Sequence, residues 1–472
     1  MPILSLGCMR FQQEWGPRIT NMNMVSSDCQ DNLVRILKRA ICEFGITHIE
    51  CARMYGCSEL QLGVALKQLF DSGVVKREDL ILQTKVGPCA TAKDFRETLE
   101  KSFSLLKVDY IDLFSLHGVN MPAQYDLIFN NGENGNCIDV VKEYVAAGKI
   151  RHVGFSTHAD QSLIRKLIET DAFDYVNLHY HYFGSYTTTG VGPHQGNLGN
   201  IKLLNEKDMG VFVISAYDKG GKVYQPSNKL RSLTLPDMEP IAFGTAWLWT
   251  HDKHEGNVVH TTVCGAARPS DLDQGAVAAY QFAQDPVKFY AKVQAVTVRL
   301  EQAKVDALGK DWLETCYQGV PKSNVSKFAV EHNQIIWCYN MIKAFGMYAF
   351  AKDRYGALEN SRAKWDKSLS LDENIDKLGR FGWGYVPGLS LDLEEDYSED
   401  FVNVPEANKA KVEEAEAFVH KWCQKPKPKG ENSNEKEEEK KEEEKEEPPV
   451  EWQDAYLMKT WVDFPDRQTR VN

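Results

Sequence analysis

A tyrosine, a lysine and a histidine near the start of the chain are the side chains whose types and spacing most clearly suggest chemistry. Tyr55 lies in IECARMYG at 49–56, Lys85 in LILQTKVG at 80–87 and His117 in IDLFSLHG at 111–118. A carbonyl that accepts a hydride becomes an alkoxide, and a phenol can protonate it when a nearby ammonium lowers the phenol pKa from ~10. We therefore expect Tyr55 to be a general acid tuned by Lys85, with His117 orienting the carbonyl oxygen.

Apolar strand-like runs that alternate with helical patterns would bring these side chains together. Helices are predicted at Asp31–Phe44 and Asp94–Leu106. The runs lie at 46–51, 80–86, 111–116, 150–155, 173–178 and 210–215. Repeated βα units over ~270 residues predict the α/β class and a closed (β/α)8 barrel, whose reactive side chains lie at the C-terminal ends of the strands. An open doubly wound sheet is the alternative, but no GxGxxG follows the first strand.

These motifs, in this order, resemble the aldo/keto reductase superfamily. The resemblance covers roughly residues 3–285 and is carried by GITHIECARMYGCSELQLGVALKQL, LILQTKVG, YIDLFSLHG and GKIRHVGFSTH. It implies a (β/α)8 barrel that binds NAD(P)H across the strand ends and uses an Asp, Tyr, Lys and His tetrad. Tyr55, Lys85 and His117 match three members, and Glu50 stands where the family usually has Asp. The chain is most similar to a branch of predicted oxidoreductases with a helical C-terminal extension.

The resemblance also assigns residues to the nicotinamide half of the cofactor. Ser156 and Thr157 stand where the family usually has Ser-Asn, and Asn177 stands where it usually has Gln. Gly7 and Met9 lie on the first strand, where a close backbone approach to the nicotinamide ribose would be useful. A simple strand-end turn is the alternative explanation for Gly7.

The loop after the seventh strand, VISAYDKGGK at 213–222, is similar to a phosphate-binding loop of the family. Gly220 would let backbone N–H groups approach a pyrophosphate. Ser215 aligns with the residue that normally stacks on nicotinamide, and Tyr217 is the nearby aromatic ring that could replace it.

The segment TTVCGAARPSDLDQ at 261–274 predicts a strand, a turn and the opening of a helix, with Ser270 as the N-cap. We expect Gly265 to contact the cofactor and Arg268 to bind a 2′-phosphate near the helix N-terminus, which favours NADP(H) over NAD(H). By resemblance, Gln274 stands at a carboxylate position that contacts adenine, and Gly275 replaces the usual Asn.

Composition fits a large soluble enzyme with an additional module. The chain has 472 residues, of which 43% are hydrophobic, and a net charge of −12. Ten Glu and four Lys at 431–447 supply about half of that charge, so neither nucleic acid nor an anionic membrane is expected as a partner. Eleven scattered cysteines without a secretory leader, and no long apolar run, predict a cytoplasmic protein with no membrane span.

Beyond the barrel the sequence changes character, and four units are predicted. They are the barrel at 1–285, a helical extension at 286–424, a disordered Glu/Lys-rich linker at 425–449 and an aromatic docking segment at 450–472. In the extension, helices are predicted at Asp285–Leu308, Trp312–Tyr317 and His332–Tyr355.

The cysteines of the extension, Cys316 and Cys338 and Cys423, lack CxxCxxC spacing, so no iron–sulfur cluster is expected. The alternating His179 and His181 lack ligand partners at suitable spacing, and no metal site is expected there either.

The docking segment at 450–472 is rich in aromatic side chains, which could return to the same chain or bind a protein partner. They are Trp452, Tyr456, Trp461 and Phe464. The loop at 179–200 is expected to form a lid or pocket wall.

The function expected is NAD(P)H-dependent reduction of an aldehyde or ketone to an alcohol, or the reverse, on a small carbonyl or alcohol substrate. The alternative is a catalytically weak nicotinamide-nucleotide-binding barrel that acts as a sensor or scaffold through its extension. An aldolase-type barrel with Lys85 as Schiff base is a third class, but it leaves Tyr55 without a role. Whether the extension caps the active site depends on the tertiary structure.

Overall fold

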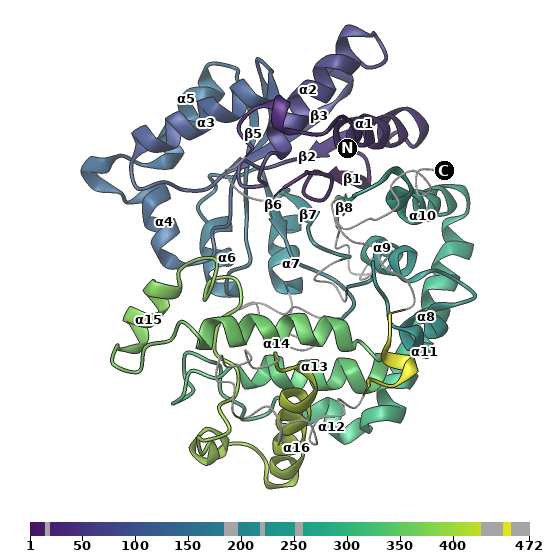
Figure 1. The fold of residues 1–472 in the computed structure, drawn as a ribbon, viewed down its shortest axis with the longest axis vertical. Coiled ribbons are helices and arrows are strands. Elements are labelled where there is room, and N and C mark those ends of the chain that lie inside the picture. The colour runs from purple at the N-terminus through teal and green to yellow at the C-terminus, as the bar shows by residue number, and fades with distance from the viewer. Residues whose placement is uncertain (15–18, 184–196, 218–221, 251–257, 426–446, 455–472) are drawn as a thin grey trace, which may run out of the picture.

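Eight parallel strands form a closed barrel in the computed structural model, which describes residues 1–14, 19–183, 197–217, 222–250, 258–425 and 447–454 (Figure 1). The strands pair in chain order, and β8 closes the barrel on β1. Their bounds are β1 Leu4–Gly7, β2 His48–Glu50, β3 Ile81–Val86, β4 Ile111–Leu116, β5 Ile150–Ser156, β6 Tyr175–Leu178, β7 Gly210–Val213 and β8 Thr261–Gly265. The predicted (β/α)8 fold is confirmed.

The register of the strands brings the polar strand ends side by side. Gly7 pairs with Glu50, and Ser156 pairs with Asn177. Lys85 pairs with Ser115, two residues before His117. Since all strands run parallel, their C-terminal ends surround one mouth of the barrel, which is where such barrels carry their sites.

Helices surround the barrel and link its strands. Their bounds are α1 Ser27–Lys38, α2 Ser58–Asp71, α3 Ala92–Leu106, α4 Pro122–Phe129, α5 Cys137–Ala146, α6 Gln161–Ile168, α7 Leu198–Glu206, α8 Asn228–Thr234, α9 Pro240–Thr250 and α10 Asp273–Gln284. The predicted helix Asp94–Leu106 corresponds to α3, whose Thr91 cap precedes it. The predicted helix Asp31–Phe44 begins earlier, because Ser26 caps α1, and ends in a π-helical turn at Arg39–Glu43.

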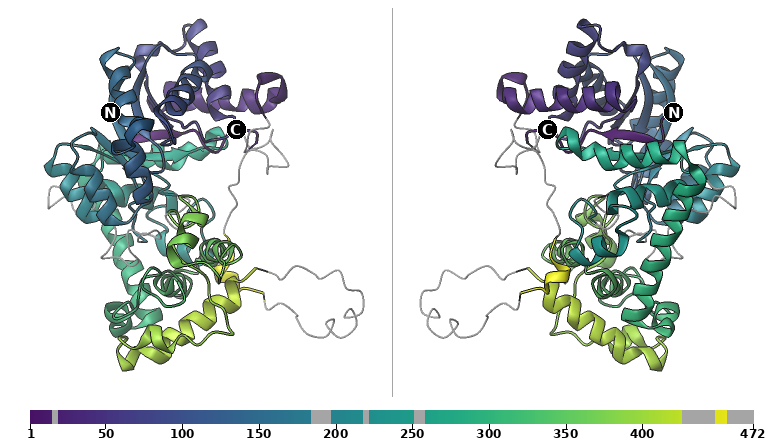
Figure 2. Two further views of the ribbon diagram at one scale, coloured as in Figure 1. Left: turned by 90° about the vertical axis from the view of Figure 1, so that its left-hand side faces the viewer. Right: turned by 90° about the vertical axis from the view of Figure 1, so that its right-hand side faces the viewer.

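The extension is a helical layer joined to the barrel by one long helix. Its helices are α11 Pro286–Leu308, α12 Lys310–Thr315, α13 His332–Phe345, α14 Tyr348–Arg362, α15 Leu371–Leu378 and α16 Glu406–Cys423. Helix α11 packs against α8, α9 and α10 of the barrel and against α13 of the extension. Figures 1 and 2 place α13, α14 and α16 together below the barrel.

The predicted continuous helix His332–Tyr355 is wrong, because the chain breaks between α13 and α14. Gly346 there has φ of 65°, a left-handed conformation that suits glycine and ends α13. A Cβ on Gly346 would also lie 2.8 Å from the carbonyl oxygen of Glu451. The break therefore makes room for a segment that is distant in sequence.

The core of the extension contains a buried charged cluster, called the His332 cluster below. The Nε2 atom of His332 lies 3.0 Å from Asp400, and its Nδ1 atom contacts Glu416 at 2.5 Å. Ser326 donates to Asp400 at 2.6 Å. Although burial opposes protonation, the two carboxylates raise the pKa of His332 to about 9.

The beginning of the predicted docking segment returns to the same chain. Trp452 is 9% exposed and packs with Trp422 and Phe418 on α16. Asp454 forms a β-bridge with Ser227 before α8. Tyr456, Trp461 and Phe464, and linker residues 426–446, lie outside the described residues. A protein partner for this segment stays a prediction.

None of the helices in the described ranges combines the length and apolar character needed to cross a bilayer.

Candidate active site

The core of the candidate site is a buried lysine held between a carboxylate and a phenol. The Nζ atom of Lys85, at the end of β3, contacts Glu50 at the end of β2 in an ion pair, and the two side chains are 1% and 3% exposed. The same atom donates to the hydroxyl of Tyr55 at 3.3 Å and to the carbonyl oxygen of Cys51 at 2.8 Å. Glu50 thus reaches Lys85 despite its additional methylene compared with the usual Asp.

His117 completes this group from the next strand end. It follows β4, and its ring lies edge-on to Tyr55, with centroids 5.6 Å apart and planes at 87°. Both side chains are half-buried, so they border the mouth rather than the closed interior. The structure therefore brings together all four predicted catalytic residues, Glu50, Tyr55, Lys85 and His117.

The direction of the tyrosine pKa differs from the sequence-based expectation. Burial raises the pKa of Tyr55 well above its ordinary value, and Glu50 adds to this, while Lys85 opposes both. The Glu50 carboxylate neutralises most of the ammonium charge that Tyr55 would otherwise feel. Burial also acts against the Lys85 charge, yet Glu50 and Tyr55 raise the pKa of Lys85 above its usual range. The site is thus a protonated phenol beside a firmly charged lysine.

Two predicted nicotinamide-binding residues stand side by side on neighbouring strands. Asn177 is fully buried, and its Oδ1 accepts a hydrogen bond from Gln83 at 2.8 Å. Among the described residues, its Nδ2 atom has no hydrogen-bond partner. Ser156 accepts from the backbone N–H of Gly118 at 3.1 Å, and its hydroxyl proton remains able to donate. An amide donor and a hydroxyl donor here match the carbonyl oxygen of a carboxamide.

The Thr157 side chain is hydrogen-bonded to the adjacent loops. Its hydroxyl donates to the carbonyl oxygen of Val119 at 2.7 Å and accepts from the N–H of Ala159 at 3.0 Å. Since Thr157 has only one hydroxyl proton, and it is used within the loops, the side chain has no donor left for a ligand.

The glycine at the end of β1 is explained by strand packing. A Cβ on Gly7 would lie 2.9 Å from the Val263 side chain on β8, so the barrel needs a small residue here. The carbonyl oxygen of Met9 accepts from the Gln12 side chain at 3.0 Å. These observations favour a local packing role for Gly7.

The loop after β7 places no aromatic ring where the sequence suggested one. Ser215 has φ of 56°, a left-handed conformation. Tyr217 is 1% exposed, and its hydroxyl lies 2.6 Å from Thr245 on α9. It therefore packs into the helical layer, which argues against stacking on a nicotinamide. Gly220 lies outside the described residues.

The turn after β8 is held by an aspartate that the sequence analysis did not single out. The prediction that Ser270 is the N-cap of this helix is wrong, because α10 begins only at Asp273. Asp271 instead accepts from the N–H groups of Ala267 and Arg268 at 3.0 and 3.1 Å. The same carboxylate binds Nε of Arg268 at 2.7 Å. Part of the Arg268 charge is thus neutralised within its own turn.

Helix α10 approaches the barrel closely at the next two predicted positions. A Cβ on Gly275 would lie 3.1 Å from Leu4 and 3.6 Å from the Tyr217 hydroxyl. Gln274 precedes it and is half-buried. Gly275 thus lies close to Leu4, which would have to shift by a few tenths of an ångström to admit a side chain at position 275.

At Gly265, the carbonyl oxygen accepts from Tyr224 at 2.5 Å. The guanidinium of Arg10 lies 4.3 Å from the centroid of the Tyr224 ring. Sequence reasoning did not select Arg10 or Tyr224, because their proximity to β8 depends on barrel closure.

The extension also contributes to the mouth. Residues 379–386, called the mouth strap below, contact the loops that follow several barrel strands, and the strap includes Arg380 and Tyr385. Neither residue is among those predicted from the sequence. The signal available was the run GRFGWGYVPG at 379–388, whose glycines indicate a turn-rich segment and whose aromatic rings are unusual in a solvated turn.

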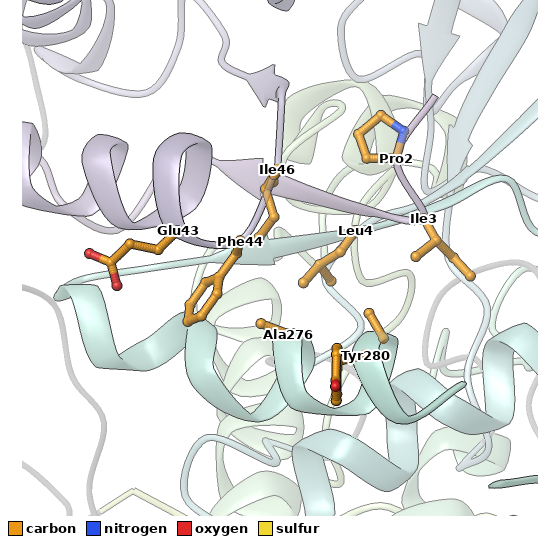
Figure 3. A pocket seen from close by; sticks show the side chains of 10 residues that line it. Pro2, Ile3, Leu4, Glu43, Phe44, Ile46, Ala276 and Tyr280 are labelled. Atoms are coloured by element: carbon orange, nitrogen blue, oxygen red, sulfur yellow. The ribbon is translucent and has the colours of Figure 1, made fainter. Parts of the chain in front are cut away.

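A cavity of about 310 Å³ lies elsewhere, at the opposite end of β1 (Figure 3). Leu4, Phe44 and Tyr280 contribute side chains to its wall. Leu4 begins β1, whereas the catalytic candidates lie where strands end, so this cavity does not form part of the candidate site.

Among the residues described, no three His, Cys, Asp or Glu side chains are arranged to hold a metal ion. His181 is buried, which lowers its pKa to about 3, and His179 packs on the ring of His158 at 4.3 Å. The part of the loop at 184–196 that was expected to form a lid lies outside the described residues.

Comparison with known proteins gives the same family for the barrel. Residues 3–232 match the family model described as the aldo/keto reductase family. A member of aldo-keto reductase family 4 from Arabidopsis thaliana is 30% identical over 160 residues, which are 32% of this chain and 50% of that protein. The NADP-dependent D-sorbitol-6-phosphate dehydrogenase of Malus domestica is 30% identical over 128 residues, which are 27% of this chain and 34% of that protein. The matches thus span half the length of these relatives or less.

A similar solved structure is the holo form of an aldo-keto reductase from Bacillus halodurans. It is 21% identical, covers 62% of this chain and 91% of its own chain, and has a TM-score of 0.46.

Proposed function

Because residues 3–232 match the aldo/keto reductase family model, we propose that the chain is an NAD(P)H-dependent oxidoreductase that reduces an aldehyde or ketone to an alcohol. The observation that carries the proposal is the position of Lys85 between Glu50 and Tyr55 at the barrel mouth, with the His117 ring against the tyrosine. This is an acid, its electrostatic stabiliser and an oxygen-orienting group in one place.

In this proposal Tyr55 donates the proton from its hydroxyl oxygen to the alkoxide that forms from the carbonyl. Its raised pKa keeps the phenol protonated before reaction, as a general acid must be. Lys85, 3.3 Å from the phenol oxygen, stabilises the tyrosinate left behind. Glu50 keeps Lys85 charged and directed, and His117 donates to the same substrate oxygen.

The pairing of Ser156 with Asn177 supports a nicotinamide site beside this acid. Asn177 Nδ2 and the Ser156 hydroxyl would bind a carboxamide. A bound nicotinamide dinucleotide supplies the hydride. Arg268 at the turn before α10 supports a preference for NADP(H), although its contact with Asp271 leaves a smaller net charge for a 2′-phosphate.

The Schiff-base alternative fits this site poorly. A lysine nucleophile needs a neutral amine, and the ion pair with Glu50 raises the pKa of Lys85 and keeps it as the ammonium. A sensor or scaffold that binds the nucleotide with little turnover is the second candidate. The observation that favours it is the raised pKa of Tyr55, which makes the phenol a weaker acid.

The test compares NADPH oxidation by the native chain and Tyr55→Phe over a panel of aldehydes and ketones. We expect the rate constant to fall ~10²- to 10⁴-fold, the usual contribution of a positioned general acid. Nucleotide binding, followed by quenching of tryptophan fluorescence, should persist. Tyr280→Phe, a change at a 66% exposed tyrosine on α10, is the matched control. Equal activity of the native chain and Tyr55→Phe would refute the role of the phenol, and binding without turnover in the native chain would favour the sensor.

A further inference from the structure

The mouth strap connects the extension to loops on one side of the barrel mouth. The carbonyl oxygen of Arg380 accepts from Asn120, after β4, at 3.2 Å. The ring of Tyr385 lies 4.9 Å from that of His158, after β5, and is nearly perpendicular to it. Helix α15, which leads into the strap, lies on the side of the barrel that carries α4 and α6 (Figure 1). The extension thus reaches the same edge of the barrel as the catalytic candidates.

The strap brings the Arg380 guanidinium to the loops that adjoin the acid and the lysine. Its Nη2 atom lies 3.6 Å from the sulfur of Met54, the residue before Tyr55. A Cβ on Gly87 would lie 2.7 and 2.8 Å from its two terminal nitrogens. Gly87 is two residues beyond Lys85, or ~7 Å along the strand direction. The lack of a side chain at Gly87 leaves the space that the guanidinium fills.

The guanidinium has no carboxylate partner among the residues described. Burial lowers the pKa of Arg380, and the opposing influence comes from the thiol of Cys89. Its other neighbours are the Met54 sulfur and the Phe381 ring, whose centroid lies 4.6 Å away. Lys85 deeper in the site is already neutralised by Glu50. A partly desolvated cation without an anion is unfavourable, and an anion that enters the mouth would be stabilised there.

We propose that Arg380 is a specificity-determining residue that binds an anionic group, a carboxylate or a phosphate, at the distal end of the carbonyl substrate. This inference rests on the proposed carbonyl reductase function, whose substrate class it narrows. Phe381 is 57% exposed and Met54 39% exposed, so they provide apolar surface beside the cation. The site therefore fits an aldehyde or ketone that carries an apolar middle and a negative end.

A purely structural role for Arg380 is the competing explanation, and the contacts of the strap separate the two. The hydrogen bond to Asn120 uses the backbone of Arg380, and the contact with His158 uses Tyr385. A Cβ on Gly384 would lie 2.8 Å from Met121, so the strap backbone also packs closely there. Arg380→Gln removes the charge and leaves all three contacts in place.

The experiment uses three matched aldehydes: 4-carboxybenzaldehyde, 4-formylphenyl phosphate and the uncharged methyl 4-formylbenzoate. The assay uses NADPH and the full-length chain, and compares kcat/KM for each anionic aldehyde with kcat/KM for the ester. This ratio should be at least ~10-fold lower in Arg380→Gln than in the native chain, mainly because KM for the anionic aldehydes rises. Arg380→Lys should restore part of the ratio. Lys377→Gln, which removes an exposed charge on α15, is the control and should leave the ratio unchanged. A larger fall for the carboxylate or the phosphate identifies the preferred anion.

If Arg380→Gln leaves the kcat/KM ratios unchanged, the inference is overturned while the proposed function stands. An equal loss of kcat/KM for all three aldehydes has the same consequence. Failure of the native chain to reduce any of them counts against the proposed function. In that case, calorimetric titration of the NADPH-loaded protein with terephthalate and with phenyl phosphate decides the role of Arg380. At least ~10-fold weaker binding by Arg380→Gln than by the native chain supports the anion site. Equal binding by the two proteins, or no binding by the native chain, overturns it.

Discussion

The barrel and the extension each bury a cation between acidic groups, but only the barrel cluster, which consists of Glu50, Tyr55, Lys85 and His117, lies at the barrel mouth. In the barrel, Lys85 contacts one carboxylate and the phenol of the half-buried Tyr55 at the mouth. In the extension, His332 contacts two carboxylates, and its side chain is 0% exposed. Asp400 also accepts hydrogen bonds from the Ser326 hydroxyl and the N–H of Lys327.

The difference shows that a shifted pKa alone does not mark a reactive group. His332 has its pKa raised to about 9, yet its imidazole is 0% exposed and both carboxylates that it contacts are buried. The Lys85 cluster also pairs a buried cation with a buried carboxylate, but its phenol, Tyr55, lies at the accessible edge. We therefore interpret the His332 cluster as a structural element of the extension and the Lys85 cluster as the chemical one.

The largest effect is expected from breaking the barrel cluster with Lys85→Met. Loss of the ammonium should lower carbonyl reduction ~10³-fold, because tyrosinate loses its stabilising charge. It should also cost about 3–5 kcal/mol of unfolding free energy, because Glu50 is left buried and unpaired. Urea unfolding and NADPH oxidation measure the two effects.

The double variant Lys85→Met with Glu50→Gln separates these effects. It should recover most of the stability, because no buried charge remains, and none of the activity. Recovery of activity together with stability would show that Lys85 acts only structurally, and the contrast between the two clusters would then disappear.

The corresponding change in the extension, His332→Gln, should affect stability and not chemistry. The folded-state pKa of His332 is about 9, above the ordinary 6.5. Protonated His332 therefore stabilises the fold fully below about pH 6.5, and this contribution is lost as pH rises through about 9. Since a pKa unit is worth about 1.4 kcal/mol, the variant should lose roughly 3 kcal/mol at pH 6 and much less above pH 9. Urea unfolding from pH 6 to 10 checks this.

His152→Gln, at a 61% exposed histidine, is the matched control and should show no such pH dependence. A fall in kcat of natively folded His332→Gln would contradict the division of roles between the two clusters.

The pH dependence of the reverse reaction tests the sign of the tyrosine shift. Alcohol oxidation needs tyrosinate, and the pKa of Tyr55 is raised, so kcat/KM for oxidation should rise ~10-fold per pH unit between about pH 7 and 10. Carbonyl reduction should stay nearly constant over the same range, because the phenol stays protonated. A plateau of the oxidation rate below pH 8 would show that Lys85 lowers the pKa of Tyr55 by more than burial and Glu50 raise it.

The smallest expected effect is that of Glu50→Asp, which places the usual family residue in this barrel. Shortening the side chain weakens its contact with Lys85 while preserving the charge, so we expect roughly a three- to tenfold lower kcat/KM. Glu50→Gln, which removes the charge, should be more severe. Steady-state reduction of one aldehyde gives kcat/KM for both variants. A lower kcat/KM for Glu50→Asp than for Glu50→Gln would show that charge at this position is unimportant.

Much of the barrel could be predicted because its signals are local. Short apolar runs that end in Glu50, Lys85 or Ser156 indicate both the strand and the functional side chain at its end. Parallel closure then brings those ends to one edge without further information. The break at Gly346 is not evident from the apolar pattern, which continues through it, and in the fold Glu451 packs closely against that glycine.

The contacts of two arginines differ in how far they could be predicted. Arg268 binds Asp271, three residues away, so spacing alone could have suggested this pair. Arg380 lies far along the chain from Met54 and Gly87, and no local pattern links them. Its place at the mouth follows from how the extension packs on the barrel.

The sequence alone determined the barrel class and the order of its strands, and it predicted which tyrosine, lysine and histidine would meet at the barrel mouth. Only the tertiary structure decided that Glu50 largely cancels the Lys85 charge, that the Tyr55 pKa rises, and that Arg380 reaches the mouth. The physical reason is that strand and helix patterns arise from neighbouring residues. Desolvation and charge–charge interaction depend instead on distances between residues that are remote in the chain.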